Sequence, residues 1–276
     1  MCGKPSTRPR RPCAAARPWP DSRPSGPTTG RCVLNWLAEH IAFRQAEAAR
    51  QACRPFAAAL REGSPAVIAE LKFHSPSKGD LRPQRDVEAV ARAYEGAGAQ
   101  ALSVLVDRRH FGGDWSFLER ARAACGLPLL AKGFFTAPVD LAQARARGAD
   151  AVLLIARALE AAELSRLVAL AHDLDLAVLL ELHDEADLAK AAGLPVDALG
   201  VNHRALDTLA LHPDQTARLA PRLPPGPVRV AESGLATRAD LDRMAALGYH
   251  AVLVGSSLMA EADPGAALRR LKGGAP

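Results

Sequence analysis

The fold is decided by a stretch in which a glycine ends a helical pattern and a buried strand follows at once, Gly148-Ala149-Asp150-Ala151-Val152-Leu153-Leu154-Ile155. Residues 138–147 before it have helical spacing, and 151–155 form an unbroken apolar run, as in a strand covered on both faces. A glycine at a helix end commonly takes the left-handed conformation, so the stretch predicts a helix-to-strand turn. The same join recurs at Gly98-Ala99 and at Gly248-Tyr249-His250-Ala251.

Apolar runs and helical patterns alternate from residue 66 onward. The runs that predict strands are 66–71, 101–105, 127–131, 151–155, 177–182, 196–201, 228–231 and 251–254. The helical patterns are 86–97, 115–124, 138–147, 160–173, 184–192, 213–220, 237–246 and 263–271. Such alternation implies parallel strands joined by right-handed crossovers, and eight units favour an α/β fold, the closed (β/α)8 TIM barrel. An open doubly wound sheet is disfavoured because no Gly-x-Gly-x-x-Gly follows a strand.

Positive charge is concentrated at the N-terminus. The chain has 276 residues and a formal net charge of +5. Residues 1–31 hold seven basic residues against one acid, so they carry +6 and the remainder −1, which gives no reason to expect a nucleic-acid partner. Residues 1–30 are rich in Pro and Arg and predict a disordered tail. Residues 31–276 are expected to form one barrel domain, preceded by an extra helix at about 33–53.

Several classes of protein are disfavoured by composition. No apolar stretch is long enough to cross a bilayer, so we expect no membrane partner. The five cysteines are scattered and form no Cys-x-x-Cys pair, which favours a reducing compartment, the cytoplasm, over disulfides or a metal site. We expect no metal and no cofactor. The oligomeric state is expected to be a monomer or a weak homodimer.

In a barrel of parallel strands, chemistry is found where the strands end. The charged or amide residues at the predicted strand ends are Glu70, Lys72, Lys132, Glu181, Asn202, Arg204 and Glu232. Glu70 and Lys72 stand two residues apart, so in a regular strand they point to the same face and can pair. So many ionisable groups at one end of a barrel indicate a site.

Two further strand ends are built of small residues, Ser233-Gly234 and Gly255-Ser256. Small residues let backbone N–H groups approach a phosphate, and a TIM barrel commonly binds phosphate after its seventh and eighth strands. Lys132 follows an apolar strand, so we expect desolvation and the nearby Lys72 to lower its pKa and ease proton donation. These features favour acid–base chemistry on a phosphorylated small molecule, with Glu181 as a base or relay.

Motifs at seven of the eight strands occur in a fixed order. The first are Val67-Ile68-Ala69-Glu70-Leu71-Lys72, Ser75-Pro76-Ser77-Lys78-Gly79, Leu102-Ser103-Val104-Leu105, Phe111-Gly112-Gly113, Leu127-Pro128-Leu129-Leu130 with Lys132 and Phe134. The others are residues 148–155, Glu181-Leu182-His183, Gly200-Val201-Asn202 with Arg204, Ala231-Glu232-Ser233-Gly234 and Val254-Gly255-Ser256-Ser257-Leu258-Met259. Over about residues 33–271 the chain therefore resembles the indole-3-glycerol-phosphate synthase family.

The resemblance implies a cofactor-free lyase of tryptophan biosynthesis. Its substrate would be 1-(2-carboxyphenylamino)-1-deoxyribulose 5-phosphate, which closes to indole-3-glycerol phosphate with loss of carbon dioxide and water. By analogy Lys132 would protonate the ribulose carbonyl, and Lys72, paired with Glu70, would hold the substrate and help to expel water. Glu181 would be the base of the late dehydration, supported by Asn202.

The resemblance also implies binding roles. Glu232 would help to shape the pocket. The phosphate would be held by Ser233, Gly234, Gly255 and Ser256. The other substrate-binding positions would be Ser75, Phe111, Phe134 and Arg204. The extra helix at 33–53 would cover the mouth and shield the apolar ring of the substrate.

Three positions depart from the family pattern. Gly133 stands where the family usually has Asp, Val106 where it commonly has Thr, and His203 where it has a second Asn. Without a carboxylate at 133, we expect Lys132 to be freer, with a lower pKa and slower catalysis. Two alternatives follow: a catalytically weakened paralogue that binds a phosphosugar, and another ribulose-phosphate barrel enzyme such as an isomerase.

Overall fold

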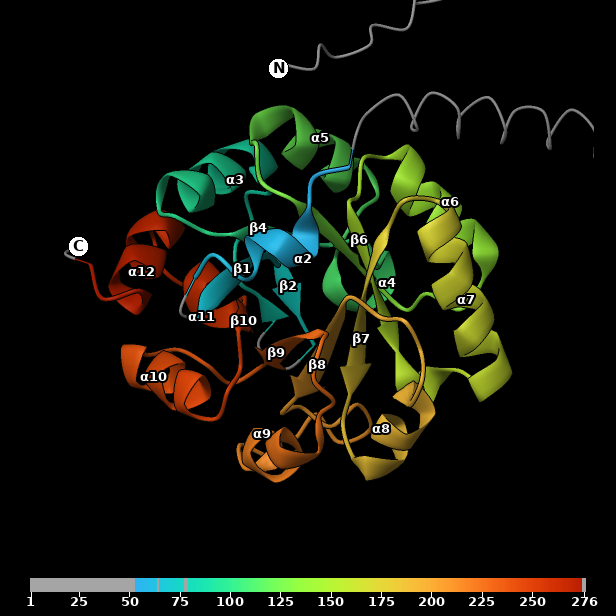
Figure 1. Ribbon diagram of the computed structural model, residues 1–276. Helices are drawn as coiled ribbons and strands as arrows, with labels where there is room; N and C mark the ends of the chain where they lie inside the picture. Colours follow the sequence, from blue (N-terminus) through green and yellow to red (C-terminus); the bar gives the residue numbers. More distant parts are fainter. Residues whose placement is uncertain (1–52, 64, 77–78, 275–276) are drawn as a thin grey trace, which may run out of the picture. The chain divides into compact units, whose positions relative to one another are not determined.

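A computed structural model describes residues 53–63, 65–76 and 79–274, and its centre is a closed barrel of parallel strands (Figure 1). The strands are β1 (Ala66–Leu71), β4 (Ala101–Leu105), β5 (Leu129–Lys132), β6 (Ala151–Ile155), β7 (Ala177–Leu182), β8 (Ala198–Asn202), β9 (Val228–Glu232) and β10 (Ala251–Val254). They pair in the order β1-β10-β9-β8-β7-β6-β5-β4, and β4 pairs with β1 to close the barrel. The predicted α/β barrel is thus confirmed. The predicted tail and the helix at about 33–53 lie outside the described residues.

Helices surround the barrel (Figure 1). The helices between or after the strands are α3 (Val87–Gly96), α5 (Ser116–Ala124), α6 (Pro138–Ala146), α7 (Ala161–Asp173), α8 (Glu185–Ala191), α9 (Gln215–Leu219), α10 (Arg238–Ala246) and α12 (Pro264–Leu271). The shorter elements are α2 (Phe56–Ala59), α4 (Arg108–Phe111), α11 (Ser256–Met259), the 3₁₀ turns η1 (Ala156–Ala158) and η2 (Ala220–Arg222), and a hairpin of β2 (His74–Ser75) with β3 (Gly79–Asp80).

The helix-to-strand joins are those expected. Gly98, Gly148 and Gly248 have φ angles of +81°, +89° and +81°, a conformation that side chains with a Cβ rarely adopt. The helix predicted over 213–220 is shorter, because Pro221 lacks the N–H that a continuing α-helix needs and the chain passes into η2. Each join therefore aims the next strand into the barrel.

The barrel interior is filled by side chains and closed at one end. The inward-facing residues are Ala66, Ile68, Ala101, Leu130, Ala151, Leu153, Leu179, Ala198, Val228, Val230, Ala251 and Leu253. Phe56 and Leu60, on and just after α2, join this cluster and are fully buried beside the strand beginnings. Arg54 Nη1 donates to the carbonyl oxygens of Cys125 and Leu127 at 2.9 and 2.7 Å, which anchors the segment before β5. The site must therefore lie at the opposite end, where the strands finish.

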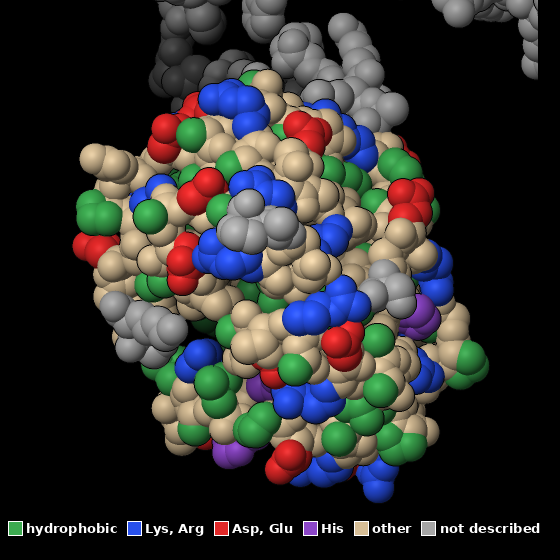
Figure 2. All heavy atoms as spheres, turned by 90° about the vertical axis from the view of Figure 1, so that its left-hand side faces the viewer, with side chains coloured by type: hydrophobic (Ala, Val, Ile, Leu, Met, Phe, Trp, Pro, Cys, Tyr) green, Lys and Arg blue, Asp and Glu red, His purple; other side chains and the backbone are tan. Residues whose placement is uncertain are grey.

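The outer surface has no dominant charge on the face drawn in Figure 2, where basic and acidic side chains are interspersed. Many of them pair, as Arg238 does with Asp242 at 2.8 Å and Arg270 with Glu261 at 3.0 Å. Within the described ranges, no helix combines the length and the apolar character that a bilayer span requires.

Candidate active site

Lys132, the last residue of β5, is the centre of a cluster of charged groups. Its Nζ atom donates a hydrogen bond to Oε2 of Glu232 at 3.0 Å. The same atom lies 3.5 Å from Oε2 of Glu70 and 4.0 Å from Oε2 of Glu181. Glu70, Glu181 and Glu232 are buried, with 5%, 2% and 0% of their side chains exposed. Four strands thus bring one ammonium group and three carboxylates to the mouth.

This geometry corrects the expected titration of Lys132. Burial by itself lowers the pKa of Lys132, because it penalises the charged form. The negative charges of Glu232, Glu70 and Glu181 outweigh burial, so the pKa of this lysine is raised above its ordinary value. The expected decrease was wrong because the sequence argument set desolvation and Lys72 against no carboxylate. Lys132 is also not freed by Gly133, since three carboxylates hold it.

Glu232 shifts in the opposite sense to a solvent-exposed carboxylate in an ion pair. Burial raises the pKa of Glu232 to about 8, Lys132 opposes this increase, and Glu181 adds to it. Three acids gathered at one cation cannot all ionise at little cost, so the cluster binds a proton readily. Lys132 remains an ammonium group, and Glu232 is the acid that takes up that proton.

Glu70 links this cluster to Lys72 and to the aromatic wall of the mouth. Its Oε1 atom lies 3.9 Å from Nζ of Lys72, as the two-residue spacing predicted. The Lys72 ammonium lies 5.2 Å from the centroid of the Phe111 ring, within cation–π range. Ser103 Oγ, from the fully buried strand β4, donates to Oε2 of Glu70 at 3.3 Å. Sequence reasoning assigned no role to Ser103, although a hydroxyl in the middle of an apolar run was a signal.

Two glycines make room for the carboxylates. A Cβ at Gly255 would lie 2.5 Å from Oε1 of Glu70, and a Cβ at Gly200 would collide with Oε1 of Glu232. Gly255 was expected at the phosphate, and the structure gives it this second requirement. The strand ends therefore need glycine because buried carboxylates lie against the backbone.

An aromatic wall stands beside the charged cluster. Phe111 and Phe134 stack with centroids 6.1 Å apart, and His110 meets the Phe134 ring edge-on at 5.5 Å. Phe134 is 43% exposed, so this wall faces outward and offers area to a planar apolar group. Trp115 and Phe135 form a separate stack at 5.8 Å.

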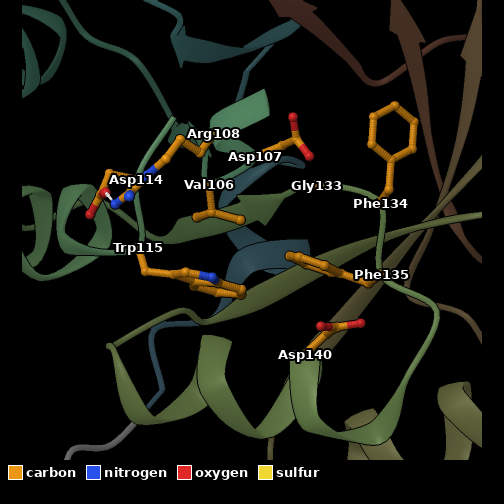
Figure 3. Close-up of a pocket in the computed structure, with 9 residues that line it drawn as sticks. All are labelled: Val106, Asp107, Arg108, Asp114, Trp115, Gly133, Phe134, Phe135 and Asp140. Atoms are coloured by element: carbon orange, nitrogen blue, oxygen red, sulfur yellow. Dashed lines mark hydrogen bonds and ion pairs between the residues drawn. The ribbon is translucent and has the colours of Figure 1, made fainter. Parts of the chain in front are cut away.

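Figure 3 shows Phe134 pointing away from Phe135, which lies with Trp115 at a cavity of about 290 Å³. A Cβ at Gly133 would lie 2.8 Å from Cε1 of Phe135 and 3.2 Å from Cγ2 of Val106. The departures at positions 106 and 133 thus lie together in one apolar contact. The space that an Asp side chain at 133 would need is taken by Phe135.

The predicted phosphate loop after β9 has an unusual backbone. Ser233 and Gly234 both have positive φ angles, +67° and +72°, and Ser233 takes that conformation although it has a Cβ. His203 Nδ1 donates to the Ser233 carbonyl at 2.8 Å, and its Nε2 accepts from the Thr216 hydroxyl at 2.9 Å. Burial lowers the pKa of His203, which favours the neutral ring. The residue that departs from the family pattern therefore supports the strained turn.

The remaining predicted residues are placed as follows. Asn202, the buried last residue of β8, accepts the backbone N–H of Arg204 at 2.9 Å. Arg204 Nη1 donates to the Leu209 carbonyl at 2.7 Å, so this guanidinium holds its own loop. Ser75 is buried on β2, and Ser256 is the first residue of α11. Across residues 53–63, 65–76 and 79–274, no group of three or more His, Cys, Asp or Glu side chains is placed to hold a metal.

A family model described as indole-3-glycerol phosphate synthase matches residues 35–271. The chain belongs to the indole-3-glycerol phosphate synthase family. An indole-3-glycerol phosphate synthase from Chromobacterium violaceum is 47% identical over 234 residues, which cover 83% of this chain and 88% of the relative. One from Neisseria gonorrhoeae is 48% identical over 238 residues, covering 85% and 90%. The carbon–carbon lyase expected from the resemblance, an enzyme of tryptophan biosynthesis, is confirmed at this level.

Solved structures share the fold of this indole-3-glycerol phosphate synthase family member. The 3-hexulose-6-phosphate synthase of Salmonella typhimurium aligns with a TM-score of 0.61 at 13% identity, covering 75% of this chain and 97% of that one. A mutant tryptophan synthase alpha-subunit from Pyrococcus furiosus aligns with a TM-score of 0.59 at 13% identity, covering 75% and 98%. At this identity the likeness shows the barrel alone.

Proposed function

We propose that this chain closes 1-(2-carboxyphenylamino)-1-deoxyribulose 5-phosphate to indole-3-glycerol phosphate through the charged cluster around Lys132. The ring carbon that bears the carboxylate bonds to the ribulose carbonyl carbon, carbon dioxide leaves, and the carbonyl oxygen departs as water. The observation that carries the assignment is the approach of Glu70, Glu181 and Glu232 to Lys132 within 4.0 Å. No cofactor is needed for these steps, which are proton transfers and the loss of neutral molecules.

Lys132 is the acid of the first step. Its raised pKa keeps the amine protonated, so a donor is in place when negative charge develops on the carbonyl oxygen. Donation leaves a neutral amine among three acids, and the proton that Glu232 binds readily lies 3.0 Å away. Glu232 can therefore restore the ammonium group within the closed site.

Glu181 is the base of the dehydration. It is buried on β7, and Lys132 lies 4.0 Å from its Oε2, so the acid and the base of the reaction share one hollow. Lys72 stands on the other side of Glu70, at 3.9 Å, where its ammonium can donate to the departing hydroxyl group. Asn202 fixes the turn after β8 and thereby the wall opposite.

The two ends of the substrate find matching surfaces. The anionic phosphate is bound by the turns at Ser233-Gly234 and Gly255-Ser256, whose small residues expose backbone N–H groups. The planar ring of the substrate packs on Phe111 and Phe134. Ser75 lines the same mouth, and Arg204 shapes it through its loop.

Every residue of this site comes from one chain, which supports a monomer or a weak homodimer as the working form. The scattered cysteines, of which Cys53 and Cys125 are free thiols in the described part, support the cytoplasm as the compartment. Neither a nucleic acid nor a membrane is needed by the reaction. The phosphorylated substrate is the partner that the site accommodates.

The direct test is the appearance of indole fluorescence when the synthetic substrate is mixed with the protein. The proposal expects steady production of indole-3-glycerol phosphate that Lys132→Met abolishes and that Glu119→Gln, an exposed carboxylate paired with Arg147, leaves unchanged. An isomerase would convert the sugar phosphate without forming indole. A paralogue that has lost catalysis would bind the substrate without turnover, and either result would overturn the proposal.

A further inference from the structure

We propose that His183 is a positioning residue that orients Glu181 and relays its proton out of the active site. His183 follows β7 directly, one residue beyond Leu182 and two beyond Glu181. Its side chain is 2% exposed, and Nε2 lies 3.3 Å from Oε1 of Glu181. On the other side of the ring, Nδ1 lies 3.5 Å from Oδ2 of Asp187. The imidazole is thus buried between two buried carboxylates.

This placement is costly unless the ring interacts with those acids. Neither ring nitrogen makes a hydrogen bond of good geometry, although both are buried, and buried polar atoms without partners are rare. Asp187 does not require the imidazole, because it already accepts the His183 backbone N–H at 2.8 Å and Arg157 Nε at 3.0 Å. The group left with an interest in the ring is Glu181, whose Oε1 faces Nε2.

A base in a closed site must dispose of the proton that it takes. Glu181 is 2% exposed, and its other oxygen faces Lys132, which is already protonated and cannot accept a proton. His183 Nε2 is therefore the acceptor next to Glu181. The relay starts with a neutral ring whose Nδ1–H faces Asp187 and whose Nε2 lone pair faces Glu181.

The transfer balances in two moves. The proton on Oε1 of Glu181 passes to Nε2, which gives an imidazolium between two carboxylates and restores the Glu181 carboxylate. The Nδ1 proton then passes to Oδ2 of Asp187 at 3.5 Å and from there to water, which returns the ring to neutrality. Charge is conserved in each move, and no co-reactant is needed.

The outer end of this relay reaches the surface. Arg157, on η1, pairs with Asp187 at 3.0 Å and with Asp184 at 2.7 Å, and its side chain is 32% exposed. The charged groups that face the ring are Glu181 from β7, Asp187 from α8 and, behind these two, Lys132 from β5 and Arg157 from η1. A line of ionisable groups therefore runs from the catalytic mouth to solvent.

The inference depends on Glu181 being the base of the proposed reaction, so Glu181→Gln is the first measurement. If that variant keeps full turnover, the proposed role of Glu181 has failed and the relay fails with it. If Glu181→Gln is inactive, the relay is tested on its own by His183→Gln, whose amide can donate a hydrogen bond but cannot carry a proton.

We expect His183→Gln to lower kcat about 10-fold or more, with KM changed less than about 2-fold, as for loss of a proton-transfer group. The solvent deuterium isotope effect on kcat should increase because proton removal becomes slower. The matched control is His172→Gln on α7, a histidine that pairs with Asp197 at 3.0 Å away from the mouth, and it should leave both constants unchanged. Unchanged kcat in His183→Gln would overturn the relay.

Two variants guard against a purely structural effect. His183→Ala leaves a space for free imidazole, and added imidazole should restore part of kcat without altering the midpoint of thermal unfolding. Asp187→Asn keeps the ring buried and removes the outer acceptor, so kcat should fall several-fold at unchanged KM. If neither rescue nor the Asp187→Asn effect is observed, His183 is a packing residue and the proposal is wrong, whether or not His183→Gln folds.

Discussion

Nζ of Lys132 lies 3.0 Å from Oε2 of Glu232, although 100 positions separate the two residues in the chain. The parallel barrel makes this contact possible, because the ends of β5 and β9 face each other across one mouth. The same convergence brings Glu70 and Glu181 to the lysine. The electrostatics of the site are therefore a property of the closed barrel and not of any one segment.

Glu232 should make stability depend on pH. Its pKa is raised from 4.5 to about 8, so the folded chain retains a proton that the unfolded chain releases. The stability that this provides is present at low pH and is lost as the pH rises from about 4.5 to about 8, by at most about 1.4 kcal/mol per pH unit. Urea unfolding of Glu232→Gln should show a flatter profile over this window, and Glu119→Gln should keep the wild-type slope. A wild-type slope in Glu232→Gln would contradict the assignment.

The glycines beside the carboxylates should tolerate no side chain. A Cβ at Gly200 or Gly255 would displace the carboxylate of Glu232 or Glu70, so Gly200→Ala and Gly255→Ala should lower kcat on the order of 10²-fold. Gly96→Ala, at a position with open space around it, is the matched control and should keep wild-type kcat. Full activity in both site variants would mean that the carboxylates need not lie where they do.

Restoring the family residue at position 133 should not improve the enzyme. An Asp side chain would begin 2.8 Å from Cε1 of Phe135, so Gly133→Asp should reduce stability by about 1–3 kcal/mol. Lys132 already meets three carboxylates, so kcat should not rise. The double variant Gly133→Asp/Phe135→Leu should recover part of the lost stability in thermal unfolding. An increase in kcat in the single variant would revive the idea that Gly133 slows catalysis.

His203 should act on phosphate binding. Its Nδ1–H holds the carbonyl of Ser233, whose positive φ is maintained against its own side chain. Loss of this hydrogen bond in His203→Ala should raise KM and weaken inhibition by inorganic phosphate by about 3- to 10-fold, with a smaller effect on kcat. His212→Ala, on an exposed residue of the same loop, serves as control. Equal losses in kcat and no change in KM would place His203 outside phosphate binding.

Much of the fold was accessible to sequence reasoning because each unit is local. The Gly148 join, the apolar runs and the helical spacing all lie within a few residues of one another, and together they predict strand, turn and helix. The strand ends then follow from topology, which is why Glu70, Lys132 and Glu232 could be proposed as neighbours. Boundaries that depended on a single proline, such as the end of α9, were less well predicted.

The properties of the site that failed are those that depend on distances across the barrel. The pKa of Lys132 was expected to fall because its apolar strand is visible in the sequence, whereas its distances to three carboxylates are not. Ser103 and His183 lie in quoted motifs, yet their partners Glu70 and Glu181 are set by the closed sheet and a single turn. His203 stood out only as a departure from the family, and its bond to Ser233 required the structure.

The most direct test of the account is kcat for indole-3-glycerol phosphate formation by Lys132→Met, measured by product fluorescence. The account predicts a decrease of about 10²- to 10⁴-fold, as expected for loss of a general acid, with the substrate still bound. Lys272→Met, which removes a lysine that donates to the Gly98 carbonyl far from the mouth, should keep wild-type kcat. A Lys132→Met enzyme within a few-fold of wild type would contradict the claim that this lysine performs the chemistry.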